Sequence, residues 1–450
     1  MDIATLVTPP RSPVPDRPLS VPGFLRAMRS NALTMWPDSA YVDDVQFRSL
    51  FGRPFVLINA PEAIHHVLVD NPENYTRSPA SVRILRPLVG NGLLLSKGES
   101  WRLQRRTIAP ALAPRVIPLL ARHVIACAEE AIVRLTHQAA EPVDLLSAMQ
   151  LLALEVAGRS MFSLEMTRFG AAMRAMLVEY SVRLAPPHLL DVLLPPSVTT
   201  LRDWQRRRFQ TRWMALVESM IHERMSLPEV DSPRDLFDLL RAARDPETGQ
   251  GFSREQLRDQ VATMILAGHE TTAVTLFWAM YLLSLDQEEQ GRVADEVGDE
   301  PITPDTLPRL VRTRAVIDET LRLYPPAFVL VRAALGPDRL PGFDVKRGLI
   351  VMIAPWVLHR HRRLWRDPDA FDPARFLPDA PKPPRFAYLP FGAGPRICVG
   401  AQFALTEATL VLAALVQRFR VALAPGERVL PRAVVITQPD HPARFVLEKK

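Results

Sequence analysis

Cys398 lies in the segment FGAGPRICVG, residues 391–400, which places a sulfur side chain among several glycines. Glycine allows turns and close backbone approaches that other residues forbid. An apolar stretch with the pattern of a long helix follows, from about Val399 to Phe419. The start of a helix carries partial positive charge and unpaired N–H groups, which stabilise a thiolate and lower its pKa. Cys398 is therefore a candidate metal ligand, although a structural cysteine beside a tight turn would have the same neighbours.

A carboxyl and a hydroxyl group stand side by side in AGHETT, residues 267–272. They interrupt the stretch 261–285, which is otherwise almost wholly apolar. Glu270 and Thr271 could pass protons to a reacting group, and Gly268 could let a helix open locally beside them. A polar patch that satisfies itself inside a core helix is the alternative interpretation.

Two further pairs have helical spacing. Glu319 and Arg322 are three residues apart in ETLR, and Trp101 and Arg105 are four apart in WRLQR. Residues at these spacings share one face of a helix. Arginine is well suited to bind carboxylates, but in isolation either pair could be a solvated surface feature.

The segment around Cys398 matches the haem-binding signature FxxGxRxCxG of the cytochrome P450 superfamily, and the chain resembles that family. The matching fixed positions are Phe391, Gly394, Arg396, Cys398 and Gly400. AGHETT resembles the family's oxygen-activation motif, ETLR its ExxR motif and WRLQR its WxxxR helix. The motifs follow the family's order over roughly residues 50–440.

The resemblance implies one buried haem b, with Cys398 as the iron ligand and thiolate ligation favouring cleavage of the O–O bond. Phe391 and Gly400 would border the haem. The predicted partners of the haem propionates are Trp101, Arg105, Arg332 and Arg396. Glu270 and Thr271, with Gly268, would deliver protons during oxygen activation.

The resemblance also implies a structural triad that fixes the loop carrying Cys398. Arg375, in PARF (373–376), would join Glu319 and Arg322 there. Such a buried carboxylate between guanidinium groups would be strongly hydrogen-bonded. Ala374 departs from the pattern, because the family commonly has glutamate at this position.

The fold implied is mainly α-helical with a small β region, a long central helix lying over the haem. A single domain would span residues 1–450, with a Pro-rich segment at 1–22 that follows the surface. The expected central helix runs from Ser253, capped in a box with Gln256, to about Leu285.

Another helix is expected from about Pro308 to Tyr324, and strands are expected within 51–61, 329–335 and 343–355. His359 and His361 are interpreted as structural, because no cysteine or carboxylate cluster accompanies them.

The activity implied is insertion of one oxygen atom from O2 into an apolar substrate, such as a fatty acid, an alkane or a terpenoid-like compound. The chain ends about 50 residues after Cys398, so electrons are expected from a separate ferredoxin-type donor and its NAD(P)H reductase. A peroxygenase or isomerase that needs no donor is the alternative, and the Glu270–Thr271 pair argues against it. A non-enzymatic haem sensor would be expected to carry an output domain.

Composition excludes several other classes. Two cysteines among 450 residues cannot form a four-cysteine zinc or iron–sulfur site, and they favour a reducing, cytoplasmic location. The net charge of +6 is spread without a long basic run, so nucleic-acid binding is not expected. Arg102 and Arg106 could instead dock an acidic electron donor. No membrane span is expected, because 261–285 carries ionisable groups at its centre.

Overall fold

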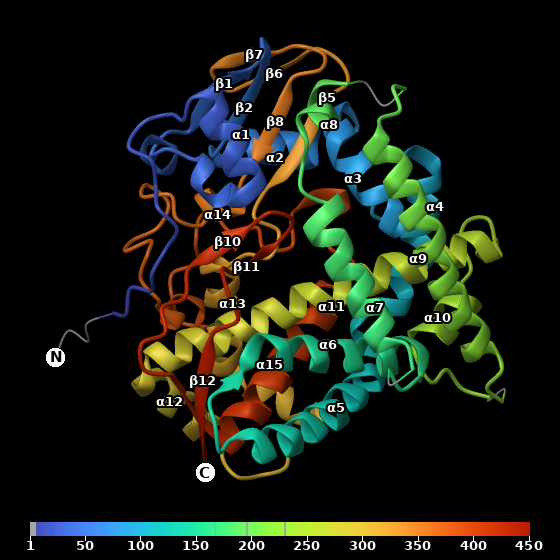
Figure 1. The fold of residues 1–450 in the computed structure, drawn as a ribbon, viewed down its shortest axis with the longest axis vertical. Coiled ribbons are helices and arrows are strands. Elements are labelled where there is room, and N and C mark those ends of the chain that lie inside the picture. Colours follow the sequence, from blue (N-terminus) through green and yellow to red (C-terminus); the bar gives the residue numbers. More distant parts are fainter. Residues whose placement is uncertain (1–5, 167, 195–196, 229–230) are drawn as a thin grey trace.

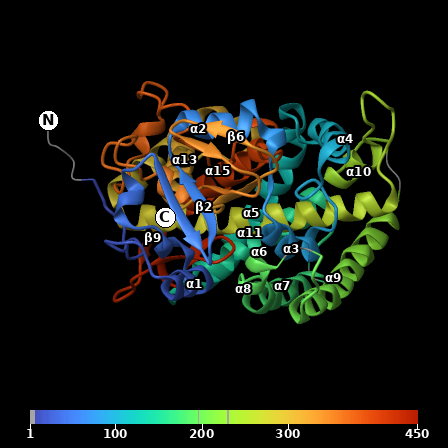
Figure 2. The ribbon, with the colours of Figure 1, turned by 90° about the horizontal axis from the view of Figure 1, so that it is seen from above.

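The computed structural model describes residues 6–166, 168–194, 197–228 and 231–450, and helices form most of it (Figure 1). The longest is α11 (Arg254–Leu285), which runs across the whole molecule when seen from above (Figure 2). Ser253 caps it: its side chain accepts from the Gln256 amide, and the Gln256 side chain accepts from the Ser253 amide. The predicted central helix and its capping box are confirmed, and its second half is buried.

Helices pack around α11 because each presents apolar side chains toward it. Those in contact with it include α3 (Pro79–Val89), α6 (Leu145–Phe162), α9 (Leu201–Met225), α10 (Leu236–Ala242), α12 (Gln287–Val297), α13 (Val311–Leu323) and α15 (Ala401–Arg418). The remaining helices are α1 (Val21–Ser30), α2 (Pro61–His65), α4 (Gly98–Ile108), α5 (Ile117–Gln138), α7 (Gly170–Glu179), α8 (Leu189–Leu193) and α14 (Pro355–Leu358).

Among the described residues, α6 is the one helix long and apolar enough to cross a membrane. Length and composition alone are weak grounds, because a core helix has the same features. Of its residues, 61% are buried inside the protein, where α6 packs against α11 and α5.

The main sheet lies at the opposite end from the chain's C-terminus (Figure 1). Its strand order is β1 (Val45–Leu50), β2 (Arg53–Ile58), β8 (Ile350–Ile353), β5 (Leu330–Ala334) and β3 (Tyr75–Arg77). Only β2 and β8 pair in parallel. The register places Arg77 directly opposite Arg332.

Three smaller sheets complete the β structure. They are β4 (Val143–Asp144) with β12 (Arg444–Lys449) and β9 (Phe419–Leu423), then β10 (Pro431–Ala433) with β11 (Thr437–Pro439), and β6 (Asp338–Leu340) with β7 (Phe343–Val345). The predicted segment 343–355 is therefore two strands, β7 and β8, separated by a turn. Its expected pairing with the strand in 329–335 is confirmed by β5 and β8.

Two boundaries differ from the prediction. Phe51 and Gly52 form the turn of a β1–β2 hairpin, so the strand expected within 51–61 begins only at Arg53. The helix expected from Pro308 begins at Val311, because Pro304–Arg309 forms a separate 3-10 helix that contains Pro308.

The Pro-rich start follows the surface as expected. Arg11 forms an ion pair with Asp369 at 2.8 Å, and the Ser12 hydroxyl donates to the Pro431 carbonyl. Residues 1–5 of the predicted Pro-rich segment lie outside the described residues, and α1 begins at Val21, near its end.

Candidate active site

The loop that carries Cys398 is held by its own backbone and by close packing. The Cys398 amide donates to the Phe391 carbonyl at 3.0 Å. Gly394 has φ +70, and a Cβ there would lie 1.9 Å from the Leu68 carbonyl oxygen, so only glycine fits. Gly400 caps α15, which begins at Ala401. Cys398 therefore lies just before the helix, which begins at Ala401 and not near Val399 as predicted.

The pKa of the Cys398 thiol is raised, contrary to the prediction. Desolvation of the sulfur raises it, although the residue as a whole is exposed, and this outweighs the Gly400 amide and the positive charge of Arg105, which both lower it. Arg105 donates to the Ile397 carbonyl at 2.9 Å, so the WxxxR helix, α4, directly contacts the cysteine loop.

A cavity of about 270 Å³ lies beside this loop and is lined by basic residues. Arg77, Arg332 and Arg396 line it together with Trp101, and the Arg396 guanidinium lies 4.3 Å from the centre of the Trp101 ring. Arg396 also donates to the Ser96 carbonyl at 2.9 Å. Arg105, which was grouped with these residues in the sequence, is not part of the lining.

The positive charges of these guanidinium groups are partly removed from water. Desolvation first, and then the neighbouring positive charges, together lower the pKa of Arg77 to about 9 and of Arg332 to about 10. The buried Nε of Arg77 has no hydrogen-bond partner within the described chain. A site that gathers buried cations in this way fits an anionic ligand.

The AGHETT motif lies on α11 without interrupting it, so the predicted local opening at Gly268 is absent. The Thr271 hydroxyl donates to the Ala267 carbonyl at 2.6 Å. Burial raises the pKa of Glu270, and no described residue hydrogen-bonds to its carboxylate. A Cβ at Gly268 would lie 3.0 Å from the Met161 side chain, so glycine lets α6 pack closely here.

His269 ties the motif to α6. Its Nε2 lies 3.2 Å from the Gln150 carbonyl, and burial lowers its pKa to about 4, which keeps the ring neutral. Nε2 must therefore carry the proton and donate.

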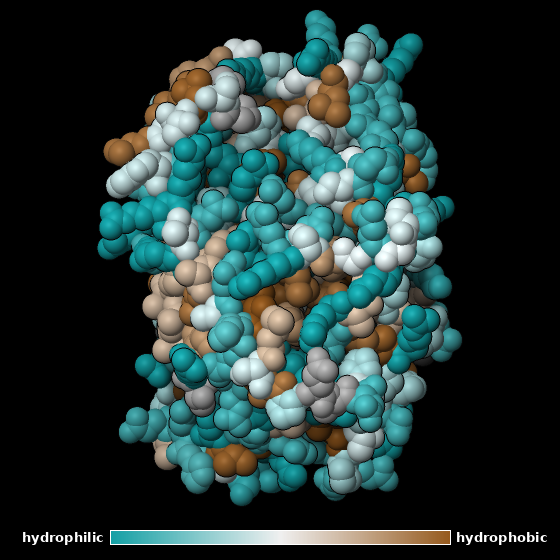
Figure 3. Space-filling model, turned by 90° about the vertical axis from the view of Figure 1, so that its right-hand side faces the viewer, coloured by the Kyte–Doolittle hydropathy of each residue, from teal (hydrophilic) through white to brown (hydrophobic). Residues whose placement is uncertain are grey.

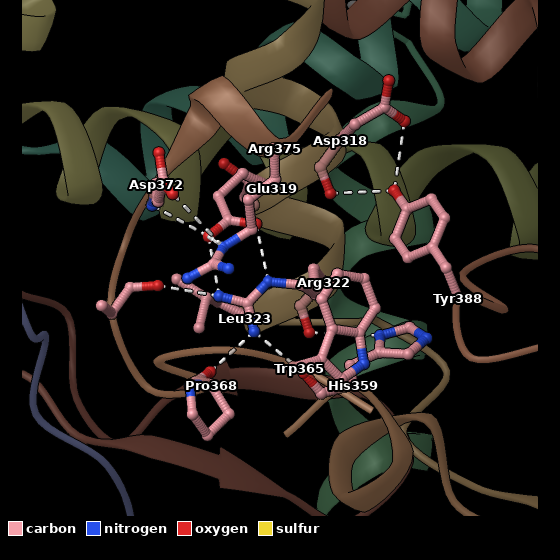
Figure 4. Close-up of polar contacts among 12 residues, drawn as sticks. Asp318, Glu319, Arg322, Leu323, His359, Trp365, Pro368, Asp372, Arg375 and Tyr388 are labelled. Carbon is pink, nitrogen blue, oxygen red and sulfur yellow. Dashed lines mark hydrogen bonds and ion pairs between the residues drawn. The ribbon is translucent and has the colours of Figure 1, made fainter. Parts of the chain in front are cut away.

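The ExxR pair is fully buried (Figure 4). Arg322 donates from Nε and Nη2 to the two Glu319 oxygens at 2.6 and 2.7 Å. Glu319 also accepts from the Asp372 amide at 2.9 Å. Arg375 stands 3.6 Å from Glu319, an ion pair without a hydrogen bond. The structure thus brings the three predicted residues together, with the Arg375 contact the loosest.

Arg322 also joins separate parts of the chain. It donates to the carbonyls of His359, Pro368 and Ala370 at 2.8, 2.6 and 2.8 Å, and its guanidinium lies 5.2 Å from the centre of the Trp365 ring. One side chain therefore holds the segment after α14 against α13.

His359 extends this network to the cysteine loop, beside Arg322 in Figure 4. Its Nε2 accepts from the Leu389 amide at 2.8 Å, so its Nδ1, 3.1 Å from the Arg322 carbonyl, must carry the proton and donate. Tyr388 adds a second tie, because its hydroxyl donates to the Asp318 carbonyl at 2.8 Å. Residues 388–389, which lead to Cys398, are thus fixed to α13 from two sides.

The structural interpretation of the HRH segment agrees with these contacts. Within the described ranges, no group of three or more histidines, cysteines and carboxylates could hold a metal ion. Both ring nitrogens of His359 hydrogen-bond to backbone groups. The Nε2 of His361 lies 3.4 Å from the Asp43 carbonyl.

Replacing His359 with asparagine is expected to flatten the acid side of the stability profile. Burial lowers the pKa of His359 from 6.5 to about 3, so the folded protein binds fewer protons than the unfolded chain as pH falls below 6.5. The wild type should lose up to about 1.4 kcal/mol per pH unit from this group between roughly pH 6 and 4. Denaturant unfolding at several pH values measures this slope.

His441→Asn is the matched control, because Glu427 and Asp440 raise the pKa of His441 and its contribution has the opposite sign. That variant should make the acid loss steeper. Identical slopes for wild type and His359→Asn would contradict the assignment of a neutral, buried imidazole.

Arg102 and Arg106, the predicted docking residues, both form ion pairs within the chain. Arg102 pairs with Glu99 and Glu73, and Arg106 pairs with Asp245 and Glu247. Their charges are largely neutralised within the chain, so the geometry does not favour these two residues as a docking site for an acidic donor.

Comparison with known proteins decides the family. The family model described as Cytochrome P450 matches residues 43–445. The chain belongs to the cytochrome P450 family. Cyclooctatin synthase of Streptomyces melanosporofaciens is 36% identical over 407 residues, covering 87% of this chain and 86% of that protein. Cyclooctat-9-en-7-ol 5-monooxygenase of the same organism is 33% identical, covering 86% and 84%.

More distant relatives have the same fold or sequence pattern. The chloroplastic protein LUTEIN DEFICIENT 5 of Arabidopsis thaliana is 30% identical, covering 84% of this chain and 68% of that protein. The crystal structure of the cytochrome P450DA heme domain superposes with a TM-score of 0.83 over 98% of both chains at 23% identity, which shows the shared fold. The predicted mainly helical P450 fold is confirmed, and the chain is a cytochrome P450 monooxygenase, an oxidoreductase.

Membership of the family implies a haem cofactor, and the residues present fit one. Within the described part of the chain, the arginines around the 270 Å³ cavity have no carboxylate partner, as expected where propionates bind, and Cys398 stands in the adjoining loop. Arg77 is part of this arrangement but was not identified from the sequence. Its only signal was one basic residue between two predicted elements, and the strand register that places it opposite Arg332 cannot be read from the sequence.

Proposed function

We propose that this P450 binds haem b through Cys398 and hydroxylates an apolar, terpenoid-like substrate. The observation that carries the proposal is the contact between three elements. The loop of Cys398, helix α4 and the cavity lined by Arg77, Arg332 and Arg396 adjoin one another, so a thiolate ligand and cations for two propionates stand together. When bound, the haem would supply the oxygen-activating chemistry.

The chain's own residues would hold this site and supply protons. Arg332, Arg396 and Arg77 would bind the propionates, with Trp101 beneath the Arg396 guanidinium. Arg105, through the Ile397 carbonyl, would fix the cysteine loop, with Phe391 and Gly400 framing it.

Glu270 and Thr271 would pass protons toward the reacting oxygen through water. Burial raises the pKa of Glu270, which favours the protonated carboxyl more than in an exposed glutamate. The Thr271 hydroxyl, directed to the Ala267 carbonyl, keeps its oxygen as an acceptor for an incoming proton.

The substrate class is inferred from apolar side chains that are incompletely buried. They come from α3, the segment after it, α11 and the turn before β5: Val82, Leu85, Leu94, Leu266 and Val329. Two relatives support a terpenoid-like ring compound over a fatty acid or an alkane. One is named a 5-monooxygenase of cyclooctat-9-en-7-ol, and the other a cyclooctatin synthase.

The electrons would come from a separate ferredoxin-type donor with an NAD(P)H reductase, in the cytoplasm. Oxygenation with peroxide alone, and none with NAD(P)H and a redox chain, would instead identify a peroxygenase. A screen of cyclic terpenoids, linear alkanes and fatty acids by the ferric haem spectrum tests the substrate class. Cyclic compounds are expected to give the largest change from low to high spin, and a response to linear chains alone would overturn the terpenoid proposal.

Thr271→Ala is expected to keep substrate binding but to divert electrons to hydrogen peroxide, because the hydroxyl that positions the proton is lost. Product per NAD(P)H oxidised should fall about 100-fold, the lower end of the range for losing one proton-transfer group. The control is Thr275→Ala one turn later, whose hydroxyl donates to the Thr271 carbonyl. Fully coupled turnover by Thr271→Ala would contradict the assigned role.

A further inference from the structure

A second cavity, of about 620 Å³, shares no lining residue with the cavity beside the cysteine loop. Its walls come from the end of α5, from β4, α6 and β12, and from Arg174 on α7. Of these elements, α5, α6 and β12 lie in the lower half of Figure 1. Small-molecule sites in proteins have volumes of roughly 300–1,000 Å³, so a compact organic molecule would fit. We call this space the α5–α7 cavity.

Apolar side chains form one part of the wall of the α5–α7 cavity. Leu135 and Val143 are buried, and Leu151 on α6 is half-buried. On the face drawn in Figure 3, by contrast, brown apolar residues are interspersed with teal polar ones, as is usual for a protein surface. Apolar residues that line one hollow can enclose the body of a ligand.

Arg174 brings a cation without a partner to this cavity. Its Nε is buried and has no hydrogen-bond partner, and its guanidinium forms no ion pair with any residue that the structure describes. Guanidinium groups that are partly removed from water ordinarily pair with carboxylates or phosphates. An unpartnered guanidinium in the wall of a cavity therefore indicates an anionic ligand.

The carboxylates near the cavity are engaged elsewhere or exposed. Glu155 pairs with Arg134 at 2.6 Å, and Asp144 accepts from the amide and the hydroxyl of Ser147 at 3.1 and 2.7 Å. Glu141 lies in the wall but is exposed to water, which screens its charge. None of these groups forms an ion pair with Arg174 in the described part of the chain.

A second arginine reaches the cavity from the C-terminal strand. Arg444 on β12 donates to the Pro142 carbonyl at 3.4 Å and has no ion pair with a carboxylate among the residues described. It stands opposite Asp144 in the ladder between β4 and β12, but the oxygens of Asp144 are taken up by Ser147. The unpaired charge around the cavity is therefore mainly positive.

We propose that the α5–α7 cavity binds a small organic carboxylate with an apolar body. Its carboxylate would pair with the Arg174 guanidinium, and Arg444 would add positive charge. The apolar body would lie against the wall that Leu135, Val143 and Leu151 form. An inorganic anion would satisfy the arginines but would leave this wall in contact with water, and a neutral hydrocarbon would leave Arg174 unpaired.

This ligand site does not rest on the proposed function, because binding there requires neither turnover nor a particular substrate. An occupant would touch α5, α6, α7 and β12 together. A ligand that binds only the folded protein raises the free energy of unfolding. Occupation of the cavity should therefore stabilise the enzyme against heat.

Calorimetric titration of the haem-loaded enzyme with naphthoate tests the proposal. Phenylimidazole is added first, so that it ligates the iron and fills the space beside the haem. Naphthoate is expected to bind with a Kd below about 1 mM and to raise the denaturation midpoint. Naphthamide, a neutral analogue of nearly the same size, should bind about tenfold more weakly, because it lacks the charge that pairs with a guanidinium.

Two variants separate the charge of the cavity from its shape. Arg174→Ala should weaken naphthoate binding by about tenfold or more and leave naphthamide binding unchanged. A purely structural role for Arg174 would instead change both affinities alike. Ala148→Phe, which adds a ring to the cavity wall, should weaken the binding of both ligands.

Arg366→Ala is the matched control, because the Arg366 side chain is 94% exposed and lies outside the cavity wall. It should leave both affinities unchanged. Unaltered haem spectra and thermal unfolding without ligand would show that each variant is folded. The proposal is overturned if the wild type does not bind naphthoate at millimolar concentration, if naphthoate and naphthamide bind equally, or if Arg174→Ala and Arg366→Ala bind naphthoate alike.

Discussion

Arg322→Ala is expected to destabilise the protein by about 3–5 kcal/mol, the cost of leaving one member of a buried ion pair without its partner. Neither Arg322 nor Glu319 has exposed side-chain surface. Removing the guanidinium leaves the Glu319 carboxylate with only the Asp372 amide and the looser ion pair with Arg375 at 3.6 Å. It also frees three backbone carbonyls that Arg322 holds in place.

The substitution should also weaken haem binding, because residues 388–389, which lead to Cys398, are tied to the same helix through His359 and Tyr388. We expect a sharply lowered denaturation midpoint and a low haem content in purified Arg322→Ala. Arg322→Lys should recover little, since one ammonium group cannot replace a planar fork that reaches two carboxylate oxygens and three carbonyls.

Arg314→Ala is the matched control on the same helix. Arg314 pairs with Asp318 at 2.8 Å, but its side chain is 40% exposed, so its loss should cost no more than about 1 kcal/mol. Equal destabilisation by Arg314→Ala and Arg322→Ala would contradict the view that the buried network determines stability here.

Cys398→Ser is expected to eliminate the thiolate-type spectrum of the reduced carbon monoxide complex and to abolish oxygenation. A hydroxyl cannot provide the electron-rich sulfur ligand that favours O–O cleavage. The fold itself should remain, because the loop is held by the Phe391 carbonyl, the Arg105 contact and the packing of Gly394, none of which uses the sulfur.

Cys127→Ser is the control, because Cys127 is the other cysteine of the chain and is buried on α5. Burial raises the pKa of Cys127 to about 12, so it stays a neutral thiol and a poor iron ligand. A thiolate spectrum that survives Cys398→Ser but disappears with Cys127→Ser would reverse the assignment.

Features encoded over short distances in the sequence were predicted well. The capping box at Ser253 and Gln256 and the apolar pattern behind it defined α11, and the spacing of Glu319 and Arg322 placed both on one face of α13. Sequence signals for a helix start gave the wrong boundary where another short helix precedes. Pro308 looked like a helix start, but the preceding residues form their own 3-10 helix around it.

Long-range arrangements could not be predicted in the same way. The position of Arg77 beside Arg332 depends on strand register, and the role of His359 depends on two backbone groups, 37 and 30 residues away. The raised pKa of Cys398 likewise reflects desolvation in the folded chain, which outweighs the local amide of Gly400 even though the residue is exposed. Gly268 lies in an uninterrupted part of α11, where its missing side chain lets Met161 on α6 pack closely, a contact that depends on how the two helices meet.

X-ray absorption at the iron edge of the haem-loaded wild-type enzyme tests the central claim most directly. The account predicts a single sulfur scatterer bound to iron in the wild type and in Cys127→Ser, and its absence in Cys398→Ser. Iron coordinated only by nitrogen and oxygen in the wild type would contradict it.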